Sequence, residues 1–140
     1  MNSSASKSGS LLHLFARLTA TVIGWTVFGV IGFVLFPFAV LIWFVTLAFD
    51  RNLLVQHLFT SWWATLYVWI HPGWKLRIEG REKLPWSGPA VLVANHQSQI
   101  DALVAFALFR PFKPISKAVV RWIPIFRWNF VLNRYVALHR

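Results

Sequence analysis

The sequence predicts an α/β domain that follows a helical membrane segment, and three observations lead to this prediction. Residues 18–49 form an apolar run without a single charged side chain. Beyond residue 72, short segments of strand character alternate with segments of helical periodicity, which is typical of α/β layers. Finally, 57% of the residues are hydrophobic, nine are tryptophan and only four are acidic, a composition that would leave a soluble domain with too much apolar surface.

The N-terminal part is expected to be helical and embedded in a membrane. Residues 1–10 are rich in serine and are expected to be disordered. A helix over residues 18–49 would be about 48 Å long, which exceeds a hydrocarbon core of about 30 Å. Pro37 lies inside this run and would kink or break the helix. For the membrane segment at 11–50, this leaves a kinked single span or a re-entrant helical hairpin.

Positive charge flanks both ends of the apolar run. Lys7 and Arg17 precede it, Arg51 follows it, and the other eleven of the 14 Lys and Arg residues lie from Lys75 onward. Because Lys and Arg concentrate on the cytoplasmic side of membranes, this distribution favours the hairpin, with both ends cytoplasmic. We therefore expect an N-terminal membrane helical hairpin with a break near Pro37, in a bacterial inner membrane, with the following domain on the cytoplasmic face.

Residues 51–71 are expected to form an interfacial amphipathic helix. Its polar residues fall on one side, and aromatic and aliphatic residues occupy the rest. The aromatic rings either anchor the helix at the headgroup level or pack into the following domain, and both can hold for different rings. The polar set is Gln56, His57, Thr60 and Ser61, and the aromatic anchor set is Trp62, Trp63, Tyr67 and Trp69.

The region from residue 72 contains the elements of the α/β layer. A half-exposed strand is predicted at 74–79 from its alternation, and a buried strand at 90–94 from its apolar run. The expected helices cover 99–109 and 124–130, and further short strands are expected at 114–116 and 135–138.

A histidine and a carboxylate five residues apart flank the predicted turn between the buried strand and the following helix. His96 can act as a general base near neutral pH, and Asp101 in the first helical turn can orient it. Ser98 and Asp101 also match a helix-capping box, so a purely structural interpretation stays open. Asn95 and Ser98 are expected to shape the turn. No nearby serine or cysteine is suited to be a covalent nucleophile, which favours direct transfer to a substrate hydroxyl.

This segment resembles the NHxSxxD motif of the glycerolipid acyltransferases, the family typified by 1-acyl-sn-glycerol-3-phosphate (lysophosphatidate) acyltransferase. The resemblance continues in WKLRIEG, REKLP and VLVANHQSQID, and then in PISK, WIPIF and the terminal YVALHR. It implies transfer of a fatty acyl group from acyl-carrier protein or coenzyme A to a lysophospholipid hydroxyl, with His96 as the base. It also places Lys117 and Arg140 near the substrate groove.

The family's later motifs, including a Glu-Gly-Thr-Arg type segment, are not found before Arg140. By this resemblance, residues 72–140 form an incomplete, truncated acyltransferase α/β domain, and we expect the chain to be inactive by itself. The competing hypothesis is a non-enzymatic small basic membrane protein, or a remnant, that binds anionic lipid.

Charge and composition indicate the partners. Lys7, Arg17 and Arg51 less Asp50 contribute +2 before His71, so +8 of the total of +10 lies after it. This charge would attract anionic lipid, a lysophosphatidate phosphate and an acidic acyl carrier. No nucleic-acid motif is present, so nucleic acid is not expected as a partner. Without cysteine, and with five scattered histidines, the sequence predicts no metal and no bound cofactor.

Overall fold

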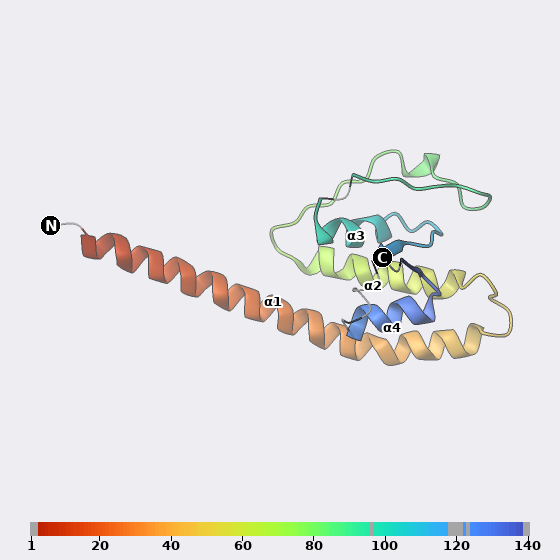
Figure 1. Ribbon diagram of the computed structural model, residues 1–140, viewed down its shortest axis with the longest axis horizontal. Coiled ribbons are helices and arrows are strands. Elements are labelled where there is room, and N and C mark those ends of the chain that lie inside the picture. Colours follow the sequence, from red (N-terminus) through yellow and green to blue (C-terminus); the bar gives the residue numbers. More distant parts are fainter. Residues whose placement is uncertain (1–2, 96, 118–121, 123, 139–140) are drawn as a thin grey trace. The chain divides into compact units, whose positions relative to one another are not determined.

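The computed structural model of the protein describes residues 3–95, 97–117, 122 and 124–138. Figure 1 shows the elements along the chain. They are the helices α1 (Ser3–Thr46) and α2 (Leu54–Ile70), the short 3₁₀ helix η1 (Arg81–Lys83), helix α3 (Gln99–Phe106), strand β1 (Ile115–Lys117), helix α4 (Pro124–Leu132) and strand β2 (Val136–Leu138). The chain divides into two compact units, residues 1–34 and 35–140, and the second contains every element after α1.

Helix α1 runs without interruption from Ser3 to Thr46, with Pro37 inside it. The helix is thus not broken at Pro37, and the expected hairpin of two arms is not confirmed. A proline removes one amide donor, and the hydrogen bonds of the flanking turns can hold the helix together on both sides. The helix also begins within the stretch that we expected to be disordered. Its stretch Leu11–Thr46, which contains an 18-residue segment with a mean hydropathy of 2.5, is long and apolar enough to cross a membrane.

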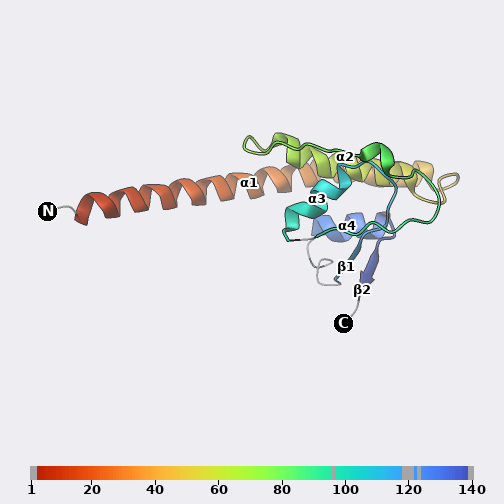
Figure 2. The same cartoon turned by 90° about the horizontal axis from the view of Figure 1, so that it is seen from above.

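Helix α2 connects the other helices of the second unit. It begins after Asp50, whose two carboxylate oxygens accept hydrogen bonds from the backbone N–H groups of Leu54 (2.9 Å) and Val55 (2.7 Å). These bonds satisfy amide donors that a helix N-terminus otherwise leaves unpaired. Helix α3 packs along α2, and α4 lies on another side of α2 (Figure 2). A helix was expected at residues 51–71, and α2 at Leu54–Ile70 confirms it.

The polar side of α2 faces the interior of the domain. The buried residues of the helix are Gln56, His57, Thr60, Ser61, Trp63, Ala64, Thr65 and Val68. An interfacial helix with its polar side in water would show the opposite orientation. Of the aromatic rings, Trp63 is packed inside with 2% of its surface exposed, whereas Trp69 is 59% exposed. The packing alternative therefore holds for Trp63, whereas Trp69 lies on the surface of the domain.

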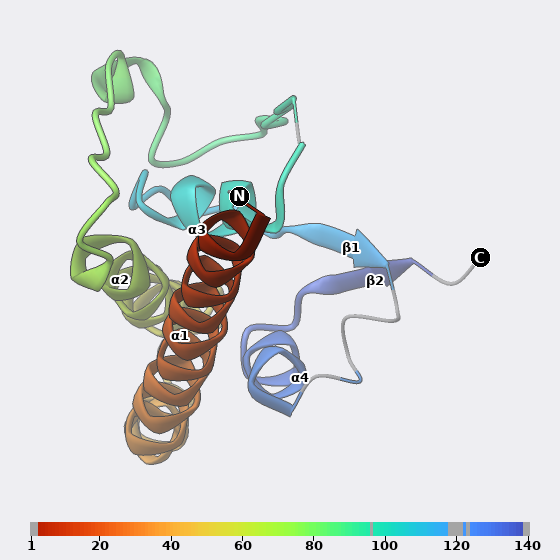
Figure 3. The same cartoon turned by 90° about the vertical axis from the view of Figure 1, so that its left-hand side faces the viewer.

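Strands β1 and β2 form a parallel pair that α4 connects (Figure 3). Ile115 lies opposite Val136 and Lys117 opposite Leu138. The strands and the helix lie within two residues of their predicted positions, so this α/β unit is confirmed. By contrast, the predicted strands at 74–79 and 90–94 are wrong, since the structure has no strand there. Residue pattern favours extended backbone, but a strand also requires a hydrogen-bonded neighbour.

A buried histidine joins α2 to the residue before β2 and to the segment that precedes β1. The His57 ring lies 2.9 Å from the Tyr135 hydroxyl through Nδ1 and 2.9 Å from the carbonyl oxygen of Arg110 through Nε2. Burial lowers the pKa of His57 and raises that of Tyr135. Because the carbonyl can only accept, Nε2–H donates to it, and Nδ1 accepts from the tyrosine O–H. His57 thus links α2 to residues 53 and 78 positions further along the chain.

Candidate functional site

The turn before α3 is held together by the side chains of Ser98 and Asp101. One carboxylate oxygen of Asp101, Oδ2, accepts from the backbone N–H groups of Gln97 and Ser98, each at 2.7 Å. In return, the Ser98 hydroxyl oxygen accepts from the backbone N–H of Ile100 at 3.3 Å. The capping box expected from the sequence is therefore present. It fixes the carboxylate of Asp101 against the turn and makes Ser98 a structural residue.

Capping and catalysis do not exclude each other at Asp101. A carboxylate held by two backbone amides is oriented before any substrate arrives, and charge-assisted bonds of this length are strong. An oriented carboxylate of this kind is what a catalytic imidazole needs as a partner.

The structure describes only part of the predicted site. Asn95 is exposed and precedes the turn, and Ser98 and Asp101 meet within it. His96 and Arg140 lie outside the described residues. Lys117 is the exposed last residue of β1 and lies opposite Leu138 of β2. Because the strands are parallel, Lys117 and Leu138 lie at the same end of the two-stranded sheet.

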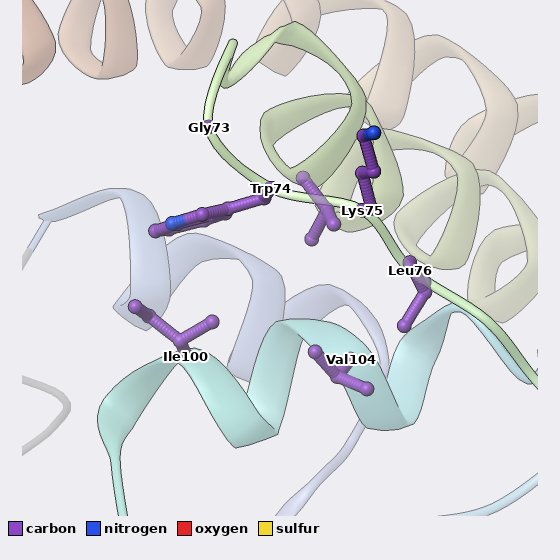
Figure 4. A pocket seen from close by; sticks show the side chains of 7 residues that line it. Gly73, Trp74, Lys75, Leu76, Ile100 and Val104 are labelled. Carbon is purple, nitrogen blue, oxygen red and sulfur yellow. The ribbon is translucent and has the colours of Figure 1, made fainter.

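An open, mainly apolar groove of about 300 Å³ lies beside the turn (Figure 4). This volume is at the lower end of the range for ligand sites. The end of α2, the segment that follows it and the first turns of α3 form its walls. The lining residues are Val68, Gly73, Trp74, Lys75, Leu76, Ile100 and Val104.

The groove adjoins the motif in the sequence, because Ile100, which lines it, is the residue before Asp101. Figure 4 shows the Trp74 ring above Ile100, and Lys75 directed away from Ile100 and Val104. The Trp74 ring is itself fixed by stacking on His71, with ring centroids 4.0 Å apart. The groove thus presents an apolar surface at the first turns of α3.

The sequence alone did not predict that these residues would form a groove. Trp74 and Leu76 alternate like the buried face of a strand, and Ile100 and Val104 repeat like a helix stripe. Both patterns are also what an ordinary core produces. The feature of the sequence that could have indicated the groove is that the apolar stripe of α3 begins at Ile100, one residue before Asp101. As for metals, residues 3–95, 97–117, 122 and 124–138 contain no group of three or more His, Asp or Glu that could hold one.

Comparison with protein families identifies residues 75–140 as a match to the family model described as Acyltransferase. A 1-acyl-sn-glycerol-3-phosphate acyltransferase from Chlamydomonas reinhardtii is 43% identical over 98 residues, which are 69% of this chain and 29% of that protein. The chloroplastic enzyme of the same name from Arabidopsis thaliana is 41% identical over 86 residues, 61% of this chain and 24% of the relative.

A bacterial protein of the same name, from Pseudomonas aeruginosa, is 25% identical over 81 residues, 56% of this chain and 31% of that protein. No solved structure matches the chain. The chain spans 24% to 31% of the length of these relatives, which come from an alga, a plant and a bacterium. The motif turn, the groove and the parallel strand pair all lie inside or next to the matched region.

Proposed function

Because this chain belongs to the glycerolipid acyltransferase family, we propose that the protein transfers a fatty acyl group from an acyl thioester to the free hydroxyl of a lysophospholipid such as 1-acyl-sn-glycerol-3-phosphate. The observation that carries this proposal is the turn that fixes the carboxylate of Asp101, at the start of a helix whose residues Ile100 and Val104 line an apolar groove. A carboxylate that orients the base, together with an apolar groove, suits the transfer of a lipid acyl chain to a polar hydroxyl.

In the proposed reaction His96 is the general base. It takes the proton of the acceptor hydroxyl as that oxygen attacks the thioester carbonyl, and Asp101 stabilises the imidazolium that results. The tetrahedral intermediate collapses to the ester, and the thiolate leaves with a proton returned by the imidazolium. The chain has no cysteine, and the Ser98 hydroxyl oxygen accepts a hydrogen bond from the backbone N–H of Ile100. Both observations support direct transfer without an acyl-enzyme.

Cationic residues would hold the anionic parts of the substrates. Lys117 at the exposed end of β1 and Arg140 further along the chain are the proposed contacts for the phosphate of the acceptor. The donor is an acyl thioester of either acyl-carrier protein or coenzyme A, both of which are anionic and suit the +8 charge of the region after His71.

A lipid acceptor and an apolar α1 agree with a membrane location, but relatives named chloroplastic do not support a bacterial inner membrane in particular.

We expect residues 1–140 alone to be inactive, because they span only 29% of the Chlamydomonas relative. Positioning of the two substrates can contribute about 7 to 11 kcal/mol to lowering a barrier, and the remainder of the domain would be needed for it. The test compares the 140 residues with a chimera that carries the C-terminal part of that relative, with lysophosphatidate and acyl thioesters as substrates. The chimera should be active. Equal activity in the two would contradict the expectation, and an inactive but folded chimera would contradict the proposed function.

The groove is the proposed site of an acyl chain, so filling it should alter chain-length preference. In the active chimera, Val104→Trp should lower kcat/KM for long-chain substrates by about tenfold or more, because each buried methylene contributes about 0.8 kcal/mol. Shorter chains should be affected less. The matched control is Ala102→Trp, which adds the same ring to an exposed position of α3. Parallel losses for all chain lengths in the Val104 variant would show that the groove is part of the core only.

A further inference from the structure

The guanidinium group of Arg110 binds the loop that contains η1. Arg110 lies shortly after the end of α3 and is half-buried. Its Nε donates to the carbonyl oxygen of Leu84 at 3.0 Å, and its Nη2 donates to the carbonyl oxygen of Arg81 at 3.0 Å. The Trp86 ring stacks on the same group, with the Cζ of Arg110 4.3 Å from the ring centroid. A single side chain therefore holds the loop at Arg81, Leu84 and Trp86.

These contacts depend on the shape of the arginine side chain. A guanidinium is planar and presents its donors in a fixed fork, so it can bind two carbonyl oxygens while an aromatic ring stacks on its face. A lysine would supply the charge without the fork or the stacking surface. Arg81 makes a contact in the opposite direction, since its Cζ lies 5.4 Å from the centroid of the Phe109 ring. The loop and the segment after α3 are thus joined from both sides.

The loop that Arg110 binds is the start of the segment that leads to the proposed base. Residues 85–95 connect the loop to His96, and Figure 1 shows them returning toward the first turn of α3. At that end the carboxylate of Asp101 binds the backbone of the motif turn. The segment is therefore tied at both ends to one helix, by Asp101 in the first turn of α3 and by Arg110 just after its last turn.

Packing contributes little to the position of this segment within the described residues. Residues 85–95 are exposed, and Val91 and Val93 keep 89% and 86% of their surface accessible. Pro85 and Pro89 each restrict a backbone dihedral within the segment. Its course is therefore set mainly by the contacts that bind its two ends, and a displacement of the loop would be transmitted to the motif.

We propose that Arg110 is a positioning residue for acyl transfer, which fixes the start of the segment leading to His96 so that the base meets the oriented carboxylate of Asp101. This inference rests on the proposed function. It assigns no contact with substrate to Arg110, because the guanidinium is engaged by backbone carbonyls and an aromatic ring. A displacement of about 1 Å can cost about 100-fold in rate, and the loss should appear in kcat rather than in KM.

Removing the guanidinium, and then supplying it from solution, tests this inference. In the active chimera, Arg110→Ala should lower kcat by about 10- to 100-fold and change KM for either substrate by less than about threefold. The alanine keeps the backbone carbonyl that accepts from His57 at 2.9 Å, so the link to α2 is untouched. Guanidinium chloride far below denaturing concentrations should restore part of kcat by occupying the vacated space, whereas sodium chloride at the same concentration should not.

Two substitutions serve as controls. Arg110→Met fills the space of the side chain without its donors, so it should lose activity without rescue by guanidinium. Arg77→Ala removes an exposed arginine that pairs with Glu79 at 2.7 Å, and it should keep near-normal kcat. Unchanged kcat in Arg110→Ala, a loss that guanidinium does not reverse, or equal rescue of the methionine variant would each overturn the inference, while the proposed function would stand.

Limited trypsin digestion of the 140-residue protein in detergent tests the contact without an activity measurement. The carbonyl that Arg110 binds at Arg81 belongs to the peptide bond that trypsin cleaves after Arg81. The ratio of this cleavage to cleavage after the exposed Arg77 should rise several-fold in Arg110→Ala and fall again with guanidinium. An unchanged ratio would overturn the inference even with an active chimera. An inactive chimera would contradict the proposed function, and the ratio would still decide whether Arg110 holds the loop.

Discussion

Replacing His96 by alanine is expected to reduce acyl transfer by a factor of about 10² to 10⁴, the usual contribution of a general base. The measurement is kcat/KM of the chimera with lysophosphatidate and an acyl thioester. The loss should appear mainly in kcat, because the proton moves only in the transition state. Binding of the variant to vesicles should be unchanged.

Gln97→Ala is the matched control for this change. Gln97 neighbours the histidine, and it is its backbone N–H that bonds to Asp101, at 2.7 Å. The alanine variant keeps that bond and should keep near-normal activity. If His96→Ala retained near-normal turnover in a protein that is folded, the turn would be a structural cap and the proposed mechanism would fall.

Replacing Asp101 by asparagine is expected to separate the two roles of this residue. The asparagine oxygen can still accept the N–H groups of Gln97 and Ser98, so the cap is largely preserved, but the negative charge is lost. Activity should fall by about 10²- to 10⁴-fold, because a neutral amide stabilises the imidazolium poorly and favours the wrong tautomer. Kinetics and thermal unfolding of the same preparation provide the measurement.

Ser98→Ala serves as the comparison, because it removes the cap bond to Ile100 and leaves the carboxylate in place. It should cost about 0.5 to 2 kcal/mol of unfolding free energy with little change in kcat. If activity followed stability in the same proportion in both variants, Asp101 would have no role beyond capping.

The α/β unit at the C-terminal end was predictable because its signals are local. Proline suited to the first helical turn opens α4, and short apolar segments on either side became the parallel pair β1 and β2. The segments at 74–79 and 90–94 have similar local signals but no strand partner in the structure. For Pro37 the local rule was also insufficient, since the rest of a helix of 44 residues continues across it.

The motif turn was predicted in more detail than any other part of the site. Ser98 and Asp101 are three residues apart, so their reciprocal bonds depend only on helix geometry. The groove was not predicted, because Trp74 and Ile100 are brought together from different elements by the packing of α3 on α2. Apolar periodicity predicts which side chains are buried, but it does not predict which other side chains they contact.

The sequence by itself determined the motif, the family, the apolar character of α1 and the residues that share each face of α2. Only the tertiary structure decided in which direction those faces point. The partners that turn the polar side of α2 inward, Tyr135 and Asn133, lie 78 and 73 residues away from the side chains that they bond. Helical periodicity groups residues on a face through local geometry, but the choice between interior and surroundings depends on which distant groups satisfy them, and that is set by the packed fold.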